Sequence, residues 1–428
     1  MILPFTIGRN LLETTLLTRK EIYGFSLFDV KYFFPVYLSD VFLLLIYQNY
    51  LSKGFTVYKK VSKLTISYKL AFVSFVTFII FTAVRSIDHE FGDLIILSSI
   101  VLIKFLLIFF VVTLINFRKH KEKINQLIAA STLFQAILII VEQFRGGNLA
   151  IFIEKTLPGM ETGTASAEAG DILRANGTFN EPNIAAVFLL INVCIILPLA
   201  FRKILLRKQI SSYLYLAVSL ISLLAIIFTG SRSIYLLTCF VLGYYFLRYK
   251  KEITKIALFC WGKLSVKIAM ALTIIVSFSY LFSRISSIPD VFNDKGSLSY
   301  RSELNRYVLL LSQRSILGIG LDMTPYYIAK NFKTMDSSPV IFDQAPAHNI
   351  FVQIITETGI FGLISFILFI YFALKDIIVI NRPVNSFAVA SIVYLFAAQF
   401  HPIFTSHPEI FSFFILYLSI ANNLRLES

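Results

Sequence analysis

The chain passes from a long polar stretch into an apolar one at residues 347–362, which read AHNIFVQIITETGIFG. The apolar run then continues for about 20 residues, the length of a helix that crosses a bilayer. His348 therefore stands at a predicted membrane boundary, where ionisable groups are costly and often functional. An unperturbed imidazole, with a pKa near 6.5, can act as a base near neutral pH. The alternative is a histidine that caps the helix or lies in the headgroup layer.

Composition indicates the class of protein. Of the 428 residues, 57% are hydrophobic and only 15% are charged. A water-soluble chain of this length could not bury so much apolar surface, so lipid must surround most of it. We expect one integral membrane domain over residues 1–428, an all-α bundle of about 11–12 transmembrane helices. The apolar segments centre on 33–50, 70–84, 94–117, 124–144, 184–201, 213–229, 233–247, 266–282, 354–373, 384–400 and 409–421.

The net charge of +14 would fit a nucleic-acid-binding protein, but its distribution argues against one. Lysines and arginines gather in alternate loops, at 53–69, 118–123, 202–208 and 248–267, whereas the loops between them carry acidic residues. This positive-inside pattern places the basic loops in the cytoplasm and the acidic loops outside. We therefore expect membrane lipid, and no nucleic acid, among the partners of the chain.

Two of the predicted external loops are large, 145–183 and 283–348. In the second, apolar residues recur at helical spacing from Leu298 to Ser315, and a shorter helix is predicted from Thr324 to Asn331. A long structured loop in a compact membrane protein is usually functional. The large external loop is therefore expected to contain short helices and part of the active site.

Three arginines on the predicted external side are candidates for binding an anion. Arg232 stands in a very short turn, where a guanidinium can reach lipid phosphate or a substrate phosphate; snorkelling to the headgroups is the alternative. Arg301 opens the external helix, and a charged surface face with Glu303 as its partner would also explain it. Arg174 precedes a helix that Asn180 or Asn183 could cap, and capping does not explain the arginine.

Motifs for nucleotide or metal binding are missing from the sequence. There is no P-loop, no Asp-x-Asp motif and no zinc spacing. The Asp88-His89-Glu90 run is explained by a solvated loop, and His401 and His407 each precede a proline in a short turn where a structural role suffices. We expect no metal and no cofactor, and we expect alanine at His401 or His407 to leave activity intact. Any chemistry must then use a donor that is already activated.

The spacing of His348-Asn349, nine residues, Gly359, two residues and Gly362 resembles the hallmark of the O-antigen ligase/polymerase superfamily of bacterial polysaccharide enzymes. Three further stretches agree with this resemblance in order and spacing. They are Gly230-Ser231-Arg232-Ser233, similar to the family's serine-arginine turn; Arg301 followed by Leu317-Gly318-Ile319-Gly320; and Arg174 to Asn183. The resemblance covers roughly residues 33–420.

The resemblance implies about a dozen transmembrane helices in the bacterial inner membrane, with a large periplasmic loop. It also implies glycosyl transfer, without metal or nucleotide, from an undecaprenyl-diphosphate-linked glycan. The family's loop histidine corresponds to His348, and its two principal arginines correspond to Arg232 and Arg301. These three are the expected catalytic residues. The expected substrate-binding residues are Arg174, Asn349, Arg306 and Gly359.

The resemblance leaves the acceptor open. A lipid A-core acceptor would make the enzyme a ligase, and a second lipid-linked glycan would make it a polymerase. A serine or threonine of a protein would make it a protein O-oligosaccharyltransferase of the same superfamily. A rival from another class is a transporter or scaffold whose arginines bind an anion or solute without chemistry.

Overall fold

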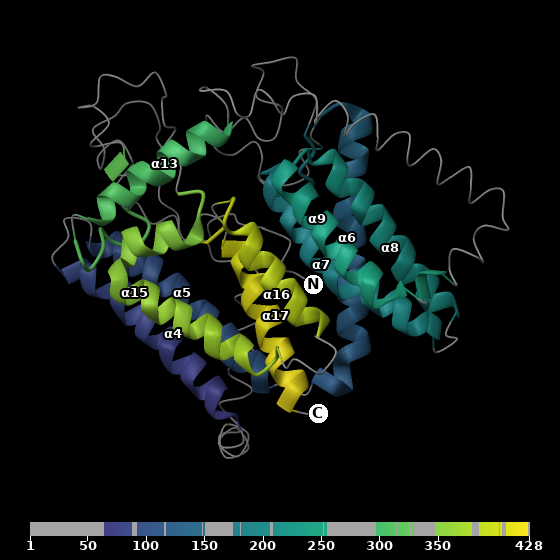
Figure 1. Cartoon of the computed structure of the whole chain (residues 1–428), viewed down its shortest axis with the longest axis horizontal. Coiled ribbons are helices and arrows are strands. Elements are labelled where there is room, and N and C mark those ends of the chain that lie inside the picture. Colours follow the sequence, from purple (N-terminus) through teal and green to yellow (C-terminus); the bar gives the residue numbers. More distant parts are fainter. Residues whose placement is uncertain are drawn as a thin grey trace.

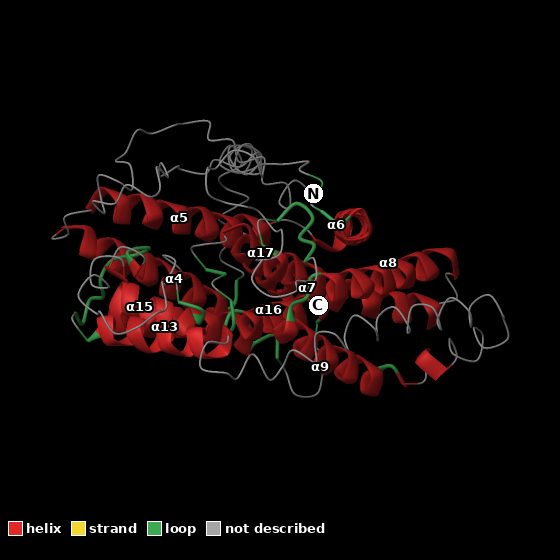
Figure 2. Ribbon diagram, turned by 90° about the horizontal axis from the view of Figure 1, so that it is seen from above, coloured by secondary structure: helices red, strands yellow, loops and turns green. Residues whose placement is uncertain are grey.

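The computed structural model describes part of the chain, and all regular elements of that part are helices (Figure 2). The predicted spans at 33–50 and 266–282 lie outside the described residues, as do most of both large external loops. The described residues are 64–87, 92–114, 117–147, 149, 174–179, 181–205, 209–250, 252–254, 297–313, 315–324, 327–328, 347–378, 385–401, 403–404 and 408–426.

Nine of the described helices coincide with predicted membrane spans, and a tenth, α13 (Ser297–Ser312), confirms the helix expected in the large loop. Four are long and apolar enough to cross a bilayer by length and hydropathy: those at Ile66–Ile87, Lys119–Arg145, Pro182–Arg202 and Ile350–Lys375. The nine are α4 (Ile66–Val84), α5 (Gly92–Leu114), α6 (Phe117–Arg145), α7 (Pro182–Leu205), α8 (Gln209–Phe228), α9 (Arg232–Arg248), α15 (Ile350–Lys375), α16 (Ser386–Ala397) and α17 (Pro408–Leu426).

The bundle is organised around α7, whose apolar side chains are almost all buried. Helices α6, α8 and α16 pack against α7, while α15 packs along α4 and α17 along α5. The outer helices turn large apolar side chains outward: Leu236, Phe240 and Leu247 of α9 are 60%, 68% and 78% exposed. Lipid covers such surfaces in a membrane. The chain is therefore an all-α, multi-pass membrane protein.

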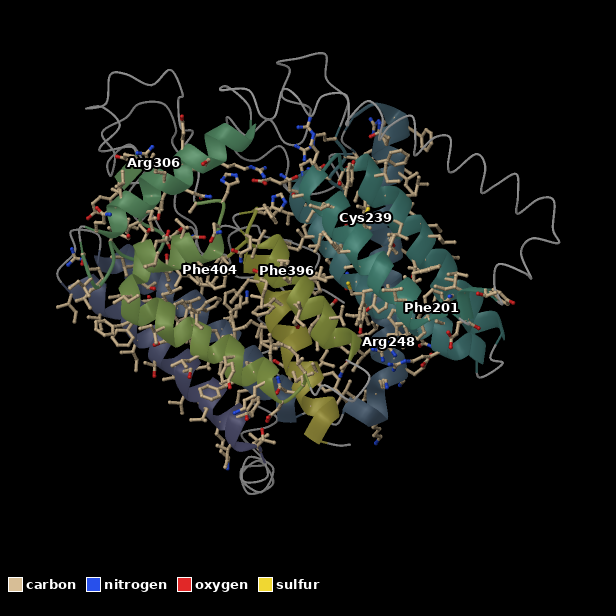
Figure 3. The ribbon with its side chains drawn as sticks, in the orientation of Figure 1. Phe201, Cys239, Arg248, Arg306, Phe396 and Phe404 are labelled. Atoms are coloured by element: carbon tan, nitrogen blue, oxygen red, sulfur yellow. The ribbon has the colours of Figure 1, made fainter. Side chains whose placement is uncertain are left out.

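The ends of helices that are not neighbours in sequence meet at one end of the bundle. The starts of α7, α9 and α15 and the end of α16 share this end, and α13 lies across it (Figure 1). Arg306, on α13, and Arg248, at the far end of α9, mark opposite ends of the molecule (Figure 3). The residues predicted to be functional therefore lie at the α13 end, away from the basic residues around Arg248.

Helix α15 is broken at Gly359, whose backbone has φ 72° and ψ −175°. Only glycine adopts this conformation readily. Residues 316–320 lie directly against the break, and the Ile319 N–H donates a hydrogen bond of 2.9 Å to the Thr356 carbonyl. A Cβ on Gly359 would lie 2.0 Å from the Ile316 carbonyl oxygen. The glycine at this distance from His348 thus has a structural cause, a close crossing of two backbone segments.

We expect Gly359→Ala to lower the free energy of unfolding by more than about 3 kcal/mol, because the strained φ alone costs about 1–3 kcal/mol and the backbone contact must also open. Thermal unfolding of the purified protein in detergent measures the effect. Gly243→Ala is the control, since nothing lies within 4 Å of a Cβ there. Gly146→Ala, with φ +75° and equally open surroundings, isolates the backbone cost. Equal stability of the Gly359 and Gly243 variants would contradict the crossing.

Candidate active site

The start of α15 is fixed to the end of α16, and this sets the position of His348. The Asn349 side-chain oxygen caps α15 by accepting from the N–H groups of Phe351 (2.9 Å) and Val352 (3.1 Å). Its amide nitrogen donates to Gln399 Oε1 at 3.0 Å. Asn349 is thus the helix cap, as its residue type favours. Helix capping therefore does not explain the imidazole of the preceding His348.

Helix α13 is attached to both of these segments by one face. Asn305 Oδ1 accepts from the His348 N–H at 3.0 Å. Arg301, one helical turn earlier on the same face, donates from Nη1 to the Phe400 carbonyl at 3.2 Å. The two contacts hold Arg301 close to the start of α15 and to the turn that follows α16.

The electrostatic partner of Arg301 is Glu181, at the start of α7. Burial lowers the pKa of the half-buried Arg301 guanidinium, and the carboxylate of Glu181 opposes that change. The sequence suggested Glu303 as the local partner, but Glu303 is exposed. A residue 120 positions away by sequence thus takes that role, and local spacing could not have identified it.

Arg174 joins the start of α7 to the turn between α8 and α9. Its Nε donates to the Thr229 carbonyl at 3.0 Å, and its Nη2 donates to Asn183 Oδ1 at 2.7 Å. The Ala175 N–H adds a bond of 3.3 Å to the Phe228 carbonyl. Arg174 therefore has a positioning role in this structure, since it fixes the turn from which α9 and Arg232 begin.

Two polar side chains of α6 support the segment that follows Arg174. Glu142 is 1% exposed, and its Oε2 accepts from the N–H groups of Asn176 (3.1 Å) and Gly177 (2.7 Å). Gln135 accepts from the Thr178 N–H at 3.1 Å. The charge-assisted bonds to a buried carboxylate are among the stronger hydrogen bonds in proteins. These bonds hold residues 176–178, in the segment that leads into α7.

The serine-arginine turn begins α9. Gly230 has φ +67°, and Ser231 is the N-cap residue, so Arg232 is the first residue of the helix and is half-buried. The next residue, Ser233, places its Oγ 2.8 Å from Nε2 of His401. Arg232 therefore lies beside the segment after α16, which Arg301 also contacts.

The sequence favoured a structural role for His401, a role that nothing in the structure contradicts. Its side chain is 1% exposed and contacts Ser233, next to Arg232. Burial lowers its pKa to about 3, and nearby charges contribute to the shift. The charges that act on the ring are those of Arg301, His348, Glu181 and Arg174. The sequence did contain one feature that points to His401 as a candidate. It is predicted to lie on the external side, and the chain has only 5 histidines.

The structure joins Arg301, the backbone of His348 and Ser233 to the segment around His401, and Arg174 holds the turn that precedes Arg232. The other predicted site residues are placed differently. Asn349 caps α15, Gly359 forms the backbone crossing, and Arg306 is exposed on α13 (Figure 3). Among the residues that the structure describes, no group of three or more His, Cys, Asp or Glu side chains could hold a metal ion. His407 and the Asp88-His89-Glu90 run lie outside the described residues.

Comparison with known proteins agrees with this geometry. Residues 217–367 match a family model described as O-antigen ligase. The matched range runs from α8 into α15 and contains Arg232, Arg301, His348 and Gly359. The chain matches none of the curated proteins with which it was compared. Together with the all-helical membrane bundle, this match over residues 217–367 supports the resemblance of the chain to the O-antigen ligase/polymerase superfamily.

Proposed function

We propose that this protein transfers or polymerises a glycan from an undecaprenyl-diphosphate-linked donor to an acceptor hydroxyl at the external face of the bacterial cytoplasmic membrane. One observation carries the proposal. Arg301 of α13 contacts the Phe400 carbonyl, Asn305 of the same helix holds the His348 backbone, and Ser233, which follows Arg232, contacts His401, so three separate segments meet after α16. Arginines gathered in this way at the end of a membrane bundle suit an anion that is itself anchored in the bilayer.

The arginines supply the electrostatic part of the proposed reaction. As the glycosyl–oxygen bond breaks, negative charge grows on the leaving diphosphate. Arg232 and Arg301 are the groups proposed to stabilise this charge, because a guanidinium can bind two phosphate oxygens at once. Fixed cations directed at developing charge are usually the largest contribution to catalysis. Arg174 then acts mainly by holding the start of α9 in place.

His348 supplies the proposed base. Its imidazole accepts the proton of the acceptor hydroxyl while the hydroxyl oxygen forms a bond to the anomeric carbon. The bond from that carbon to the diphosphate oxygen breaks in the same step, and its electron pair leaves with the diphosphate. The expected outcome is inversion at the anomeric carbon.

The location of the cluster fits a lipid-linked donor. It lies at the α13 end of the bundle, which the charge pattern of the loops assigns to the external side. A diphosphate attached to a bilayer lipid lies at this depth, and the glycan extends from it into the aqueous phase. We therefore propose a periplasmic active site that part of the 283–348 loop helps to form.

The proposed reaction needs no divalent metal and no nucleotide. Purified protein, lipid-linked donor and acceptor should give the same rate in excess EDTA as in added Mg²⁺, because the arginines carry the charge neutralisation. Gel or mass analysis of the product measures transfer. A strict requirement for Mg²⁺ or Mn²⁺ would show that this assignment of the arginines is wrong.

The same assay separates the acceptors when lipid A-core, a second lipid-linked glycan and a serine- or threonine-containing peptide are supplied in parallel. A lipid A-core product identifies a ligase, lengthening of the lipid-linked glycan a polymerase, and a glycopeptide a protein O-oligosaccharyltransferase. Movement of the lipid-linked glycan or of an anion across proteoliposomes, with no transfer to any acceptor, would instead support the transporter.

A further inference from the structure

One ring nitrogen of His401 is buried without a hydrogen-bond partner among the described residues. Nε2 is 2.8 Å from Ser233 Oγ, but Nδ1 has no such contact, although the whole side chain is only 1% exposed. A buried polar atom that makes no hydrogen bond costs free energy, so it needs an explanation. A ligand that the structure does not contain is one such explanation.

The surroundings of His401 determine which form its ring takes. The groups whose charges reach it are Arg301 on α13, His348 at the start of α15, and Glu181 and Arg174 beside α7, while Ser233 of α9 contacts it directly. Positive charge prevails in this set, and burial also opposes protonation. The ring is therefore neutral in the physiological pH range, with one nitrogen as a donor and the other as an acceptor.

A hydrogen bond from the Ser233 hydroxyl can determine which ring nitrogen of His401 carries the proton. A hydroxyl that donates to Nε2 leaves the proton on Nδ1, and the unpartnered atom is then an N–H donor. An N–H donor next to Phe400, whose carbonyl holds Arg301, is suited to an anionic oxygen. Unlike a further cation, it adds no repulsion while the site is empty.

We propose that His401 is a donor-binding residue of this site, in which Ser233 holds the tautomer whose Nδ1–H donates to a diphosphate oxygen of the lipid-linked substrate. The inference rests on the proposed function and deepens it, because it assigns a neutral hydrogen bond to the leaving group beside the cationic ones. The role differs from that of a general base, which would have to take up a proton against the surrounding positive charge.

Two substitutions of similar size test the contributions of the two ring nitrogens of His401 separately. The amide of His401→Asn lies near the position of Nδ1, and the amide of His401→Gln lies near that of Nε2. Binding of undecaprenyl diphosphate to the purified full-length protein in nanodiscs should stay within about threefold of wild type for His401→Asn. It should weaken by about 10- to 100-fold for His401→Gln, the effect of losing one hydrogen bond to a charged group.

Kinetics and controls complete the test. His401→Gln should raise KM for the lipid-linked donor more than it lowers kcat. Its pH–rate profile should keep the acid limb of the wild type, since His401 is not the group that titrates. His120→Ala, an exposed histidine on α6, should behave as wild type. Thermal unfolding of each variant detects loss of the folded structure. Such a loss would weaken donor binding in His401→Asn and His401→Gln alike.

The outcomes separate the two proposals. Absence of undecaprenyl diphosphate binding by the wild type would count against the donor site and thus the proposed function. Normal binding by both the wild type and His401→Gln would overturn the role of His401 alone. Loss of kcat and of the acid limb in His401→Asn, with donor binding intact, would mean that His401 is a general base. If the His401 variants do not fold, Ser233→Ala should weaken binding and Ser233→Thr should not; equal binding by both would overturn the proposal.

Discussion

Replacement of His348 by alanine is expected to lower glycan transfer by about 10²–10⁴-fold, the usual contribution of a general base, while the protein still folds. The structure supplies the reason for expecting both results together. The cap of α15 is made by Asn349, and the contact with Asn305 is made by the backbone N–H of His348. Alanine keeps that N–H and leaves the cap in place. Removal of the imidazole is therefore expected to lower transfer activity and to leave the folding of the protein unchanged.

The measurement is transfer to acceptor per amount of folded protein, with donor binding determined on the same sample. His120→Ala is again the matched control. Donor binding should survive in His348→Ala, because the proposed role of the imidazole concerns the acceptor hydroxyl. A variant that retained most of its transfer activity would show that His348 is not the base, even though the family assignment would stand. Transport of the donor by a wild type that shows no transfer would instead favour the rival class.

The fold could be predicted largely from local sequence, because a bilayer forces each spanning segment to satisfy its own backbone hydrogen bonds. For that reason apolar length alone located the nine described spans, and helical spacing located α13. Tertiary contacts were not predictable in this way. Glu142 holds Asn176 and Gly177 from 34 and 35 residues away, and nothing in the local pattern of α6 indicates which segment it contacts.

The candidate site residues stay predictions. His348 was chosen because ionisable groups at a membrane boundary are costly, and Arg301 and Arg174 were chosen on the family resemblance; Arg301 and the His348 backbone are both held at the segment after α16. His401 was assigned to a structural role because its following proline explained a turn well enough. Local sequence could not reveal its contact with Ser233, 168 residues away, on which the proposed donor-binding role depends.

Two residues expected to bind substrate have structural roles that spacing could not reveal. Asn349 stands next to His348 and is used as a cap and as a link to Gln399. Gly359 is needed because residues 316–320 cross α15 there. The motif that joins the histidine to the glycine therefore combines one group proposed for chemistry with two that set its position. The expectation that Asn349 and Gly359 bind substrate stays a prediction.

Arg301→Lys is expected to lower kcat by about 10²–10³-fold, comparable to the loss of one donor that stabilises transition-state charge. Lysine keeps the positive charge but loses the planar fork. Arg301 uses Nη1 to contact the Phe400 carbonyl, and its other N–H groups remain to bind phosphate oxygens in a fixed direction. A lysine ammonium could not hold that carbonyl and two phosphate oxygens in the same geometry.

Transfer rates at saturating donor measure this effect, and Arg248→Lys is the control because Arg248 lies at the opposite end of the bundle (Figure 3). Arg306→Lys belongs in the same series, since it tests the expectation that the exposed arginine of α13 also binds substrate. If Arg301→Lys kept most of the wild-type kcat, charge alone would be sufficient at this position. The planar fork of the guanidinium would then contribute little to stabilisation of the leaving diphosphate, and its contact with the Phe400 carbonyl would serve mainly to attach α13 to the turn after α16.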